Sequence, residues 1–423
     1  MKINTIYIRN FKGFKGDKFS FDPNMSVLIG DNGSGKTSVL DALSFVLGTF
    51  FLGIDGVPSR PLKEYEKRRV ILSPESIEIQ LPFGIDVEHT LAGESYHWSR
   101  DTNKKTGGAT SYKNANDLID MAKIYVQRVR NGDDVDLPLI AYYGTARLAR
   151  EHHQKLAYKK QGSRLDGYYG ALDPSSFRRK FLEWFKTFED SKLKFGKDDT
   201  LYKAFTGVIT SMVPSWTQVH FSWEADDMLG QLDNGEWMSF GMLSDGYQNI
   251  IRLAADIAYR AITLNPHLGK NAVIDTEGVV LVDEIDMHLH PSWQKTIITD
   301  LKNTFPKIQF IVTTHSPFIV QSLSADELIN LDGQSGEAPL TKSIEDIAET
   351  EMHVADVRRS QRFLEMQSLA SEYFGLIEQG KTAKNDVETK NIKADLDAIE
   401  LEFSDDPVYV ALMQAERKTG FTS

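Results

Sequence analysis

Apolar positions along the first fifty residues change their period, and the change predicts strands followed by a helix. Isoleucines spaced along 2–9 are typical of a half-buried strand, and Phe19 and Phe21 predict a return strand. The run 25–29 is almost entirely apolar and predicts a buried strand, whereas apolar residues recur at helical spacing over 39–47. We therefore expect three strands and then a helix.

Three continuous apolar runs follow further along the chain, at 139–143, 279–282 and 308–312. Short runs without polar alternation are typical of strands that are covered on both faces. Residues 76–98 alternate instead, which predicts an antiparallel meander, and 246–263 has the pattern of an amphipathic helix. This combination predicts an α/β fold with a mixed sheet and flanking helices.

The middle and the end of the chain have a helical pattern. Residues 146–215 are basic and aromatic-rich, and Asp233-Asn234-Gly235 is a hairpin signal between strand-like segments. We expect four segments: an N-terminal lobe (1–145), a basic helical insertion (146–235), a C-terminal lobe (236–345) and a helical C-terminal extension (346–423).

Composition and charge narrow the class of protein. The 423 residues carry a formal net charge of −12 and include no cysteine, which excludes disulfides and thiolate sites. No apolar run is long enough to cross a bilayer, so we expect a cytoplasmic protein without a membrane partner. Residues 147–197 hold 13 Lys/Arg against 6 Asp/Glu. This excess of positive charge could form a surface that binds DNA, or it could belong to a solvated helical face.

Residues 30–37 read G-D-N-G-S-G-K-T, a complete phosphate loop between a predicted strand and a predicted helix. Its glycines let backbone N–H groups turn toward a phosphate chain, Lys36 supplies a positive charge, and Thr37 supplies a hydroxyl for Mg²⁺. The helix N-terminus favours an anion at the same place. The sequence thus predicts ATP and Mg²⁺ as ligands. The expected binding residues of the loop are Asn32, Gly33, Ser34, Gly35, Lys36, Thr37 and Ser38.

Two carboxylates follow the apolar run 279–282. A strand would deliver Asp283 to its carboxyl edge, where the carboxylate can hold Mg²⁺ together with Thr37. Glu284 is then the candidate to polarise the attacking water. Alone, the Asp-Glu pair could belong to an ordinary loop, but its combination with a phosphate loop favours catalysis.

Two weaker signals could also contact an anion. Ser244 and Gly246 lie in an L-S-D-G segment that opens the predicted amphipathic helix, although a plain N-cap would look the same. His315 follows the run 308–312 and could contact a γ-phosphate, or it could be an ordinary turn histidine.

The order of these four motifs resembles the ATP-binding-cassette ATPases, and more narrowly the branch that contains SMC proteins, RecF and OLD-type ATPases. Ile8–Phe14 is similar to the opening strand motif of that branch, and Asp283–Pro291 to its DE-x-D-x-H-L-H-P stretch. The resemblance covers 1–145 and 240–335 with specific motifs. It implies nucleotide binding by Lys12, Ser244 and Gly246, and catalytic roles for Glu284 and His315. The glutamine of the family's Q-loop stays open between Gln127 and the turn at 142–147.

In this superfamily the L-S-x-G segment completes the nucleotide site of a second subunit, so the resemblance implies a homodimer or a higher homo-oligomer around ATP. The segment between Arg147 and Leu243 is too short for SMC coiled-coil arms. Among the branch members, the ATPase subunits of Septu and retron-associated anti-phage systems are most similar, through 139–145 and 406–418. That family implies an HNH-type, PtuB-like nuclease partner that cuts DNA, with the C-terminal extension as the candidate docking segment.

Alternative interpretations remain. The chain could be a RecF-like ATP-dependent DNA clamp, or an ATP-binding scaffold with little turnover. His288 and His290 could hold a metal, although in the resembled family this stretch lies at the dimer seam. Asp395 and Asp397 form a D-x-D, which its helical context predicts to be a solvated helix face rather than a nuclease site.

Overall fold

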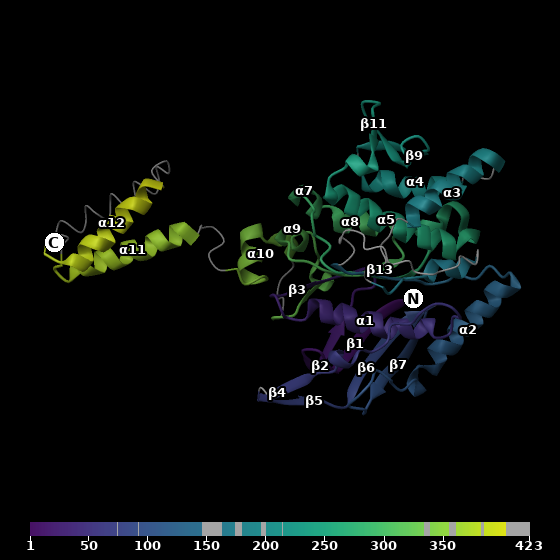
Figure 1. Cartoon of the computed structure of the whole chain (residues 1–423), viewed down its shortest axis with the longest axis horizontal. Helices are drawn as coiled ribbons and strands as arrows, with labels where there is room; N and C mark the ends of the chain where they lie inside the picture. The colour runs from purple at the N-terminus through teal and green to yellow at the C-terminus, as the bar shows by residue number, and fades with distance from the viewer. Residues whose placement is uncertain are drawn as a thin grey trace. The chain divides into compact units, whose positions relative to one another are not determined.

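The computed structural model contains two compact units, Met1–Ile347 and Ala348–Ser423, whose elements are labelled in Figure 1. The described residues are 1–73, 75–91, 93–145, 163–173, 180–195, 200–213, 215–333, 339–354, 361–381 and 385–402. The strands are β1 (Lys2–Phe11), β2 (Phe14–Ser20), β3 (Met25–Ile29), β4 (Arg69–Ser73), β5 (Ser76–Ile79), β6 (Phe83–Leu91), β7 (Glu94–Thr102), β8 (Leu139–Tyr143), β9 (Trp216–Ser222), β10 (Asp227–Leu232), β11 (Trp237–Ser239), β12 (Gly278–Val282), β13 (Ile308–Thr313) and β14 (Leu328–Asn330). The α-helices are α1 (Lys36–Phe51), α2 (Asn116–Asn131), α3 (Lys180–Phe195), α4 (Thr200–Met212), α5 (Asp245–Leu264), α6 (Ala272–Asp275), α7 (Pro291–Gln294), α8 (Ile297–Thr304), α9 (Pro317–Val320), α10 (Ile344–Thr350), α11 (Gln361–Glu378) and α12 (Val387–Glu402).

Five parallel strands form the central sheet of the first unit, in the order β14-β3-β13-β12-β8. Every residue of β3, β8, β12 and β13 is buried, which explains why these runs are apolar without alternation. The strands predicted from the continuous runs are confirmed, and so is the α/β class. Because all five strands point the same way, their carboxyl ends lie along one edge.

Four further strands form a separate antiparallel sheet in the order β2-β1-β6-β7. Ile6 lies opposite Val87 and Ile8 opposite Ile85, so the face that these residues share is apolar and buried. The sequence led us to expect one mixed sheet, whereas the structure places the parallel strands and the antiparallel strands in separate sheets. The expected meander over 76–98 is also divided, because β5 pairs with β4 and does not join β6.

Helix α1 lies between the two sheets, and this position explains its apolar character on all sides. It contacts β1 and β6 of the antiparallel sheet and β12 and β13 of the parallel sheet. Figure 1 shows α1 between β13 on one side and β1 and β6 on the other. Phe45, Phe50 and Phe51 are almost fully buried, and the Phe45 ring meets that of Phe83 edge-on at 5.9 Å. Covered from both sides, α1 holds its first residue, Lys36, in a fixed place at the sheet edge.

The opposite face of the parallel sheet is covered by α5 and α8 (Figure 1), and α3 and α4 pack on α5. The last part of the segment 146–235 and the residues just after it form the three-stranded sheet β11-β10-β9, which agrees with the strand-like segments expected on either side of the hairpin signal. Strand β9 buries Trp216, Val219 and Phe221, because it packs against α4 and α3. The hairpin predicted at Asp233-Asn234-Gly235 is confirmed as the turn between β10 and β11. Of the 13 basic residues in the stretch 147–197, 8 lie outside the described residues.

The second unit is built on a pair of helices, α11 and α12, that pack together. Met366 and Ala370 of α11 and Leu396 and Ile399 of α12 form its buried cluster. Asp395 and Asp397 are exposed on either side of buried Leu396, which agrees with a solvated helix face. The segment 403–423, which includes the stretch 406–418 that carries part of the resemblance, lies outside the described residues. Among the helices that the structure describes, none is long and apolar enough to span a membrane.

One buried histidine makes the stability of the fold depend on pH. His89 of β6 is 1% exposed and accepts a hydrogen bond at Nδ1 from Trp98 Nε1, at 2.9 Å. Burial, followed by the positive charge of the N-terminus, lowers the pKa of His89 to about 4 from its ordinary 6.5. Between pH 6.5 and pH 4 the unfolded chain therefore binds a proton at His89 that the folded chain does not bind. The free energy of unfolding falls as the pH drops through this range.

We predict that His89→Phe, which keeps a ring against Tyr96, makes the free energy of unfolding depend less steeply on pH. Wild type should lose up to about 3 kcal/mol of unfolding free energy through His89 over that range, and the variant should lose less. Thermal denaturation between pH 7 and pH 5 measures the difference. His97→Gln, which changes an exposed histidine on β7, serves as the control. Equal pH slopes for wild type and His89→Phe would contradict the assignment.

Candidate nucleotide-binding site

Five strand ends converge at the carboxyl edge of the parallel sheet, which is where α/β proteins place their ligands. The phosphate loop follows β3, Asp283 follows β12, and Thr314 and His315 follow β13. The outer strands add Gly144 after β8 and Asp332 after β14. The sheet order thus brings together side chains that are up to three hundred residues apart.

The phosphate loop needs its glycines for two reasons. Gly30, Gly33 and Gly35 have φ values of 142°, 94° and 106°, in the region that side chains avoid. A β-carbon on Gly35 would also lie 2.7 Å from Phe14 Cζ, and one on Gly30 would lie 2.7 Å from Ser34 Oγ. Only a glycine fits at either place, so the loop keeps its backbone close to whatever it surrounds.

Lys36 curls back over this loop. Its Nζ donates to the carbonyl oxygens of Gly30 at 2.6 Å and Asp31 at 2.9 Å, and the side chain is buried. Burial lowers the pKa of Lys36, and nearby carboxylates, first Asp332 and then Asp283, counteract this. The ammonium is thus held by two backbone carbonyl oxygens of its own loop.

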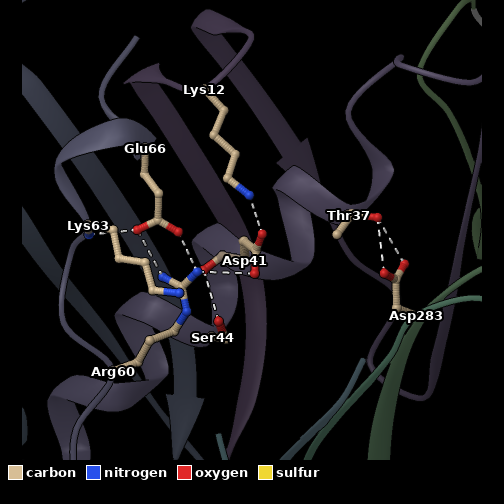
Figure 2. A network of polar contacts seen from close by, with 8 residues as sticks. All are labelled: Lys12, Thr37, Asp41, Ser44, Arg60, Lys63, Glu66 and Asp283. Carbon is tan, nitrogen blue, oxygen red and sulfur yellow. Dashed lines mark hydrogen bonds and ion pairs between the residues drawn. The ribbon is translucent and has the colours of Figure 1, made fainter. Parts of the chain in front are cut away.

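A hydroxyl and a carboxylate face each other where Mg²⁺ is expected (Figure 2). Thr37 Oγ1 lies 3.0 Å and 3.2 Å from the two carboxylate oxygens of Asp283, which is 3% exposed. Such hard oxygen donors suit Mg²⁺. Ser34 Oγ, at the loop, is buried without a hydrogen-bond partner among the described residues, which suits a site that receives further oxygen atoms. The predicted metal residues therefore lie together.

Glu284 is held in a strained backbone conformation beside this pair. Its φ is 48°, in the left-handed region, which costs about 1–3 kcal/mol for a residue with a side chain. Thr313 holds it there, because its Oγ1 accepts from Glu284 N at 2.7 Å and its carbonyl accepts from Ile285 N at 3.0 Å. The same Thr313 hydroxyl donates to Asp283 Oδ1 at 2.7 Å. One threonine thus fixes both carboxylate residues.

His315 lies at the neighbouring strand end with an exposed side chain. Asp286 Oδ1 accepts hydrogen bonds from Thr314 Oγ1 at 2.6 Å and from His315 N at 3.3 Å. The turn that carries the histidine is therefore tied to the segment that follows Glu284. Its side chain points toward solvent at the sheet edge, where it is free to meet a ligand.

The L-S-D-G segment lies on the other side of the parallel sheet from α1. Ser244 is the exposed N-cap residue of α5, which packs on β8, and Figure 1 shows α5 and α1 on opposite faces. A β-carbon on Gly246 would lie 2.4 Å from His288 O, and Asn249 Nδ2 donates to Met287 O at 3.2 Å. The beginning of α5 is thus fixed to the segment after Glu284.

Lys12, which the resemblance assigned to nucleotide binding, forms an ion pair with Asp41 on α1. Arg60 joins the same carboxylate at 3.1 Å and reaches Glu66 at 2.6 Å (Figure 2). Sequence reasoning missed Asp41, Arg60 and Glu66. No motif distinguishes a carboxylate on α1, such as Asp41, or a cation in the segment between α1 and β4, such as Arg60. Gln127, one candidate for the Q-loop, lies on α2 and donates to Asn131.

A glycine loop that faces a buried aspartate and a strained glutamate is what a phosphate-loop nucleoside triphosphatase requires. The family model described as "AAA domain, putative AbiEii toxin, Type IV TA system" matches residues 25–321. Because this match covers more than half of the chain, the protein belongs to that family of AAA domains, and it is an ATPase.

Curated relatives match most of the chain. "Retron Vc95 probable ATPase" of Vibrio cholerae serotype O1 biovar El Tor is 27% identical, over 78% of this chain and 73% of that protein. "Septu protein PtuA" of Bacillus mycoides (strain KBAB4) is 29% identical, over 81% of this chain and 42% of that protein. The expected kinship with Septu and retron ATPases is confirmed. Among solved structures, the "SMC head domain from Thermotoga maritima" matches with a TM-score of 0.44 and 15% identity, over 78% of this chain and 94% of that one.

We predict that Thr313→Val slows ATP turnover roughly 10- to 100-fold, because valine can neither orient Asp283 nor hold Glu284 N. Thr313→Ser keeps the hydroxyl and should retain most of the activity. Steady-state phosphate release measures both, and thermal denaturation checks that both variants are folded. If valine supports wild-type turnover, Thr313 does not organise the site.

Proposed function

We propose that the chain is the ATP-hydrolysing regulatory subunit of a bacterial anti-phage defence complex of the Septu or retron type. The observation that carries the proposal is the Thr37–Asp283–Thr313 arrangement beside the phosphate loop, in a chain that retron and Septu proteins match over 78% and 81% of its length. The match to RecF of Lactococcus lactis covers 11% of the chain, which gives the DNA-clamp alternative much less support.

Different groups of the phosphate loop bind different parts of ATP and its metal ion. Backbone N–H groups between Gly33 and Thr37 surround the phosphates, and Lys36 leaves its carbonyl partners for the outer phosphate oxygens. Thr37 and Asp283 would hold Mg²⁺. When bound, this ion neutralises phosphate charge. Ser34 Oγ, which is buried without a partner among the described residues, would donate to a phosphate oxygen.

Glu284 orients the attacking water and accepts its proton. The strained backbone at Glu284 follows directly on Asp283, so the carboxylate that holds the ion and the carboxylate that activates water have a fixed relation. His315, exposed at the next strand end, would contact the γ-phosphate and so respond to its loss. Its backbone tie to Asp286 couples that response to the segment beyond Glu284.

The second half of the site comes from another copy of the chain. Ser244 is exposed and its side chain caps no N–H group of α5, so the hydroxyl and the positive end of the helix are available to a γ-phosphate outside this subunit. Two copies would then hold two ATP molecules between them, and hydrolysis would release the pair. The dimer would control an HNH-type nuclease partner that cuts DNA, with the C-terminal extension as its docking segment.

We predict that Glu284→Gln yields a stable dimer in the presence of ATP and Mg²⁺, because it still binds ATP but no longer accepts the proton of water. Native mass measurement reports the dimer, and phosphate release reports the lost turnover. Adding Lys36→Ala to this variant removes the phosphate contact and should return it to the mass seen without ATP. A monomeric Glu284→Gln chain that hydrolyses ATP normally would refute the assigned role of Glu284.

A further inference from the structure

A carboxylate that no sequence motif predicts lies directly against the phosphate loop. Strand β14 runs parallel to β3 with Asn330 opposite Ile29, and Leu331 N donates to Ile29 O at 3.0 Å. This register carries Asp332 to the place where the loop begins. Asn330 Oδ1 accepts from Asp332 N at 3.0 Å, so the backbone at Asp332 is fixed as well.

The Asp332 carboxylate holds the first peptide of the loop. Its Oδ2 accepts a hydrogen bond from Asp31 N, and a β-carbon on Gly30 would lie only 2.7 Å from the same oxygen. Lys36 Nζ bonds the carbonyls of Gly30 and Asp31 from the other side of this short stretch. The entry of the loop is therefore held between a carboxylate and an ammonium.

The same carboxylate acts on the charge of the site. Asp332 and the ammonium of Lys36 both bond to the short stretch Gly30–Asp31, so two opposite charges act on the entry of the loop. Asp283, which follows β12, has a use for its charge as a ligand of Mg²⁺. Asp332 follows β14, which lies on the other side of β3 from β12. A triphosphate that enters the loop brings several negative charges, which a carboxylate beside Lys36 repels.

We propose that Asp332 is a positioning residue with two effects: it clamps the entry of the phosphate loop through Asp31 N–H, and its charge weakens nucleotide binding so that nucleotide can leave. The inference rests on the proposed function only in taking the ligand to be ATP. It gives β14 a role in the site that follows from its register with β3 rather than from any motif.

Two substitutions separate the clamp from the charge. Asp332→Asn keeps an acceptor oxygen for Asp31 N–H but removes the charge, and Asp332→Ala removes both. The matched control is Asp326→Asn, which removes an exposed carboxylate just before the amino end of β14. The dissociation constant of a fluorescent ATP analogue is measured at low and high salt, and hydrogen exchange is followed across residues 30–33.

Asp332→Asn should bind the analogue roughly three- to tenfold more tightly than wild type at low salt, and less so at high salt because salt screens the charge. Asp332→Ala should bind more weakly than Asp332→Asn, with faster exchange at the loop entry, whereas Asp326→Asn should match wild type. Equal or weaker binding by Asp332→Asn, or unchanged exchange in Asp332→Ala, overturns the inference. Failure of wild type itself to bind the analogue would instead refute the proposed function.

Discussion

The carboxylate of Asp283 joins the phosphate loop to the neighbouring strand end, because it accepts hydrogen bonds from Thr37 at the start of α1 and from Thr313 at the end of β13. This contact depends on the position of α1. Two sheets enclose the helix, and its buried aromatic face leaves it no freedom to slide along the strands. Because the phosphate loop leads directly into α1, the position of the helix also fixes the position of the loop.

The parallel register extends the same constraint to the other side chains. Val282 of β12 lies beside Val312 of β13, and Thr313 lies beside Leu28 of β3. The residues that follow these strands therefore meet at one edge, at distances set by the backbone. Asp332 joins them through β14, which is only three residues long. The register of this short edge strand thus places a carboxylate at the entry of the phosphate loop.

Sequence patterns predicted those elements that have a distinctive local arrangement of residues. The phosphate loop, the buried runs and the amphipathic helix α5 all follow from local patterns of glycine and apolar residues. The division into two sheets did not follow, since strand pairing depends on contacts between distant segments. The roles of Thr313, Asp332 and Asp41 were likewise hidden, because a lone threonine or aspartate has no distinctive spacing. The N-terminal strand motif likewise did not show that Lys12 forms an ion pair with Asp41 of α1.

A dimer that forms around ATP requires Ser244 of one copy to lie against the phosphate loop of the other copy. The chain contains no cysteine, so Asp245→Cys in one copy and Asn32→Cys in a differently tagged copy give two unique thiols. A short bifunctional maleimide added to the mixed copies, in the Glu284→Gln background, reports whether the two sites meet. The account predicts a crosslink between the two tags that forms with ATP and Mg²⁺ and not without nucleotide. Equal crosslinking with and without ATP, or none in either case, would contradict it.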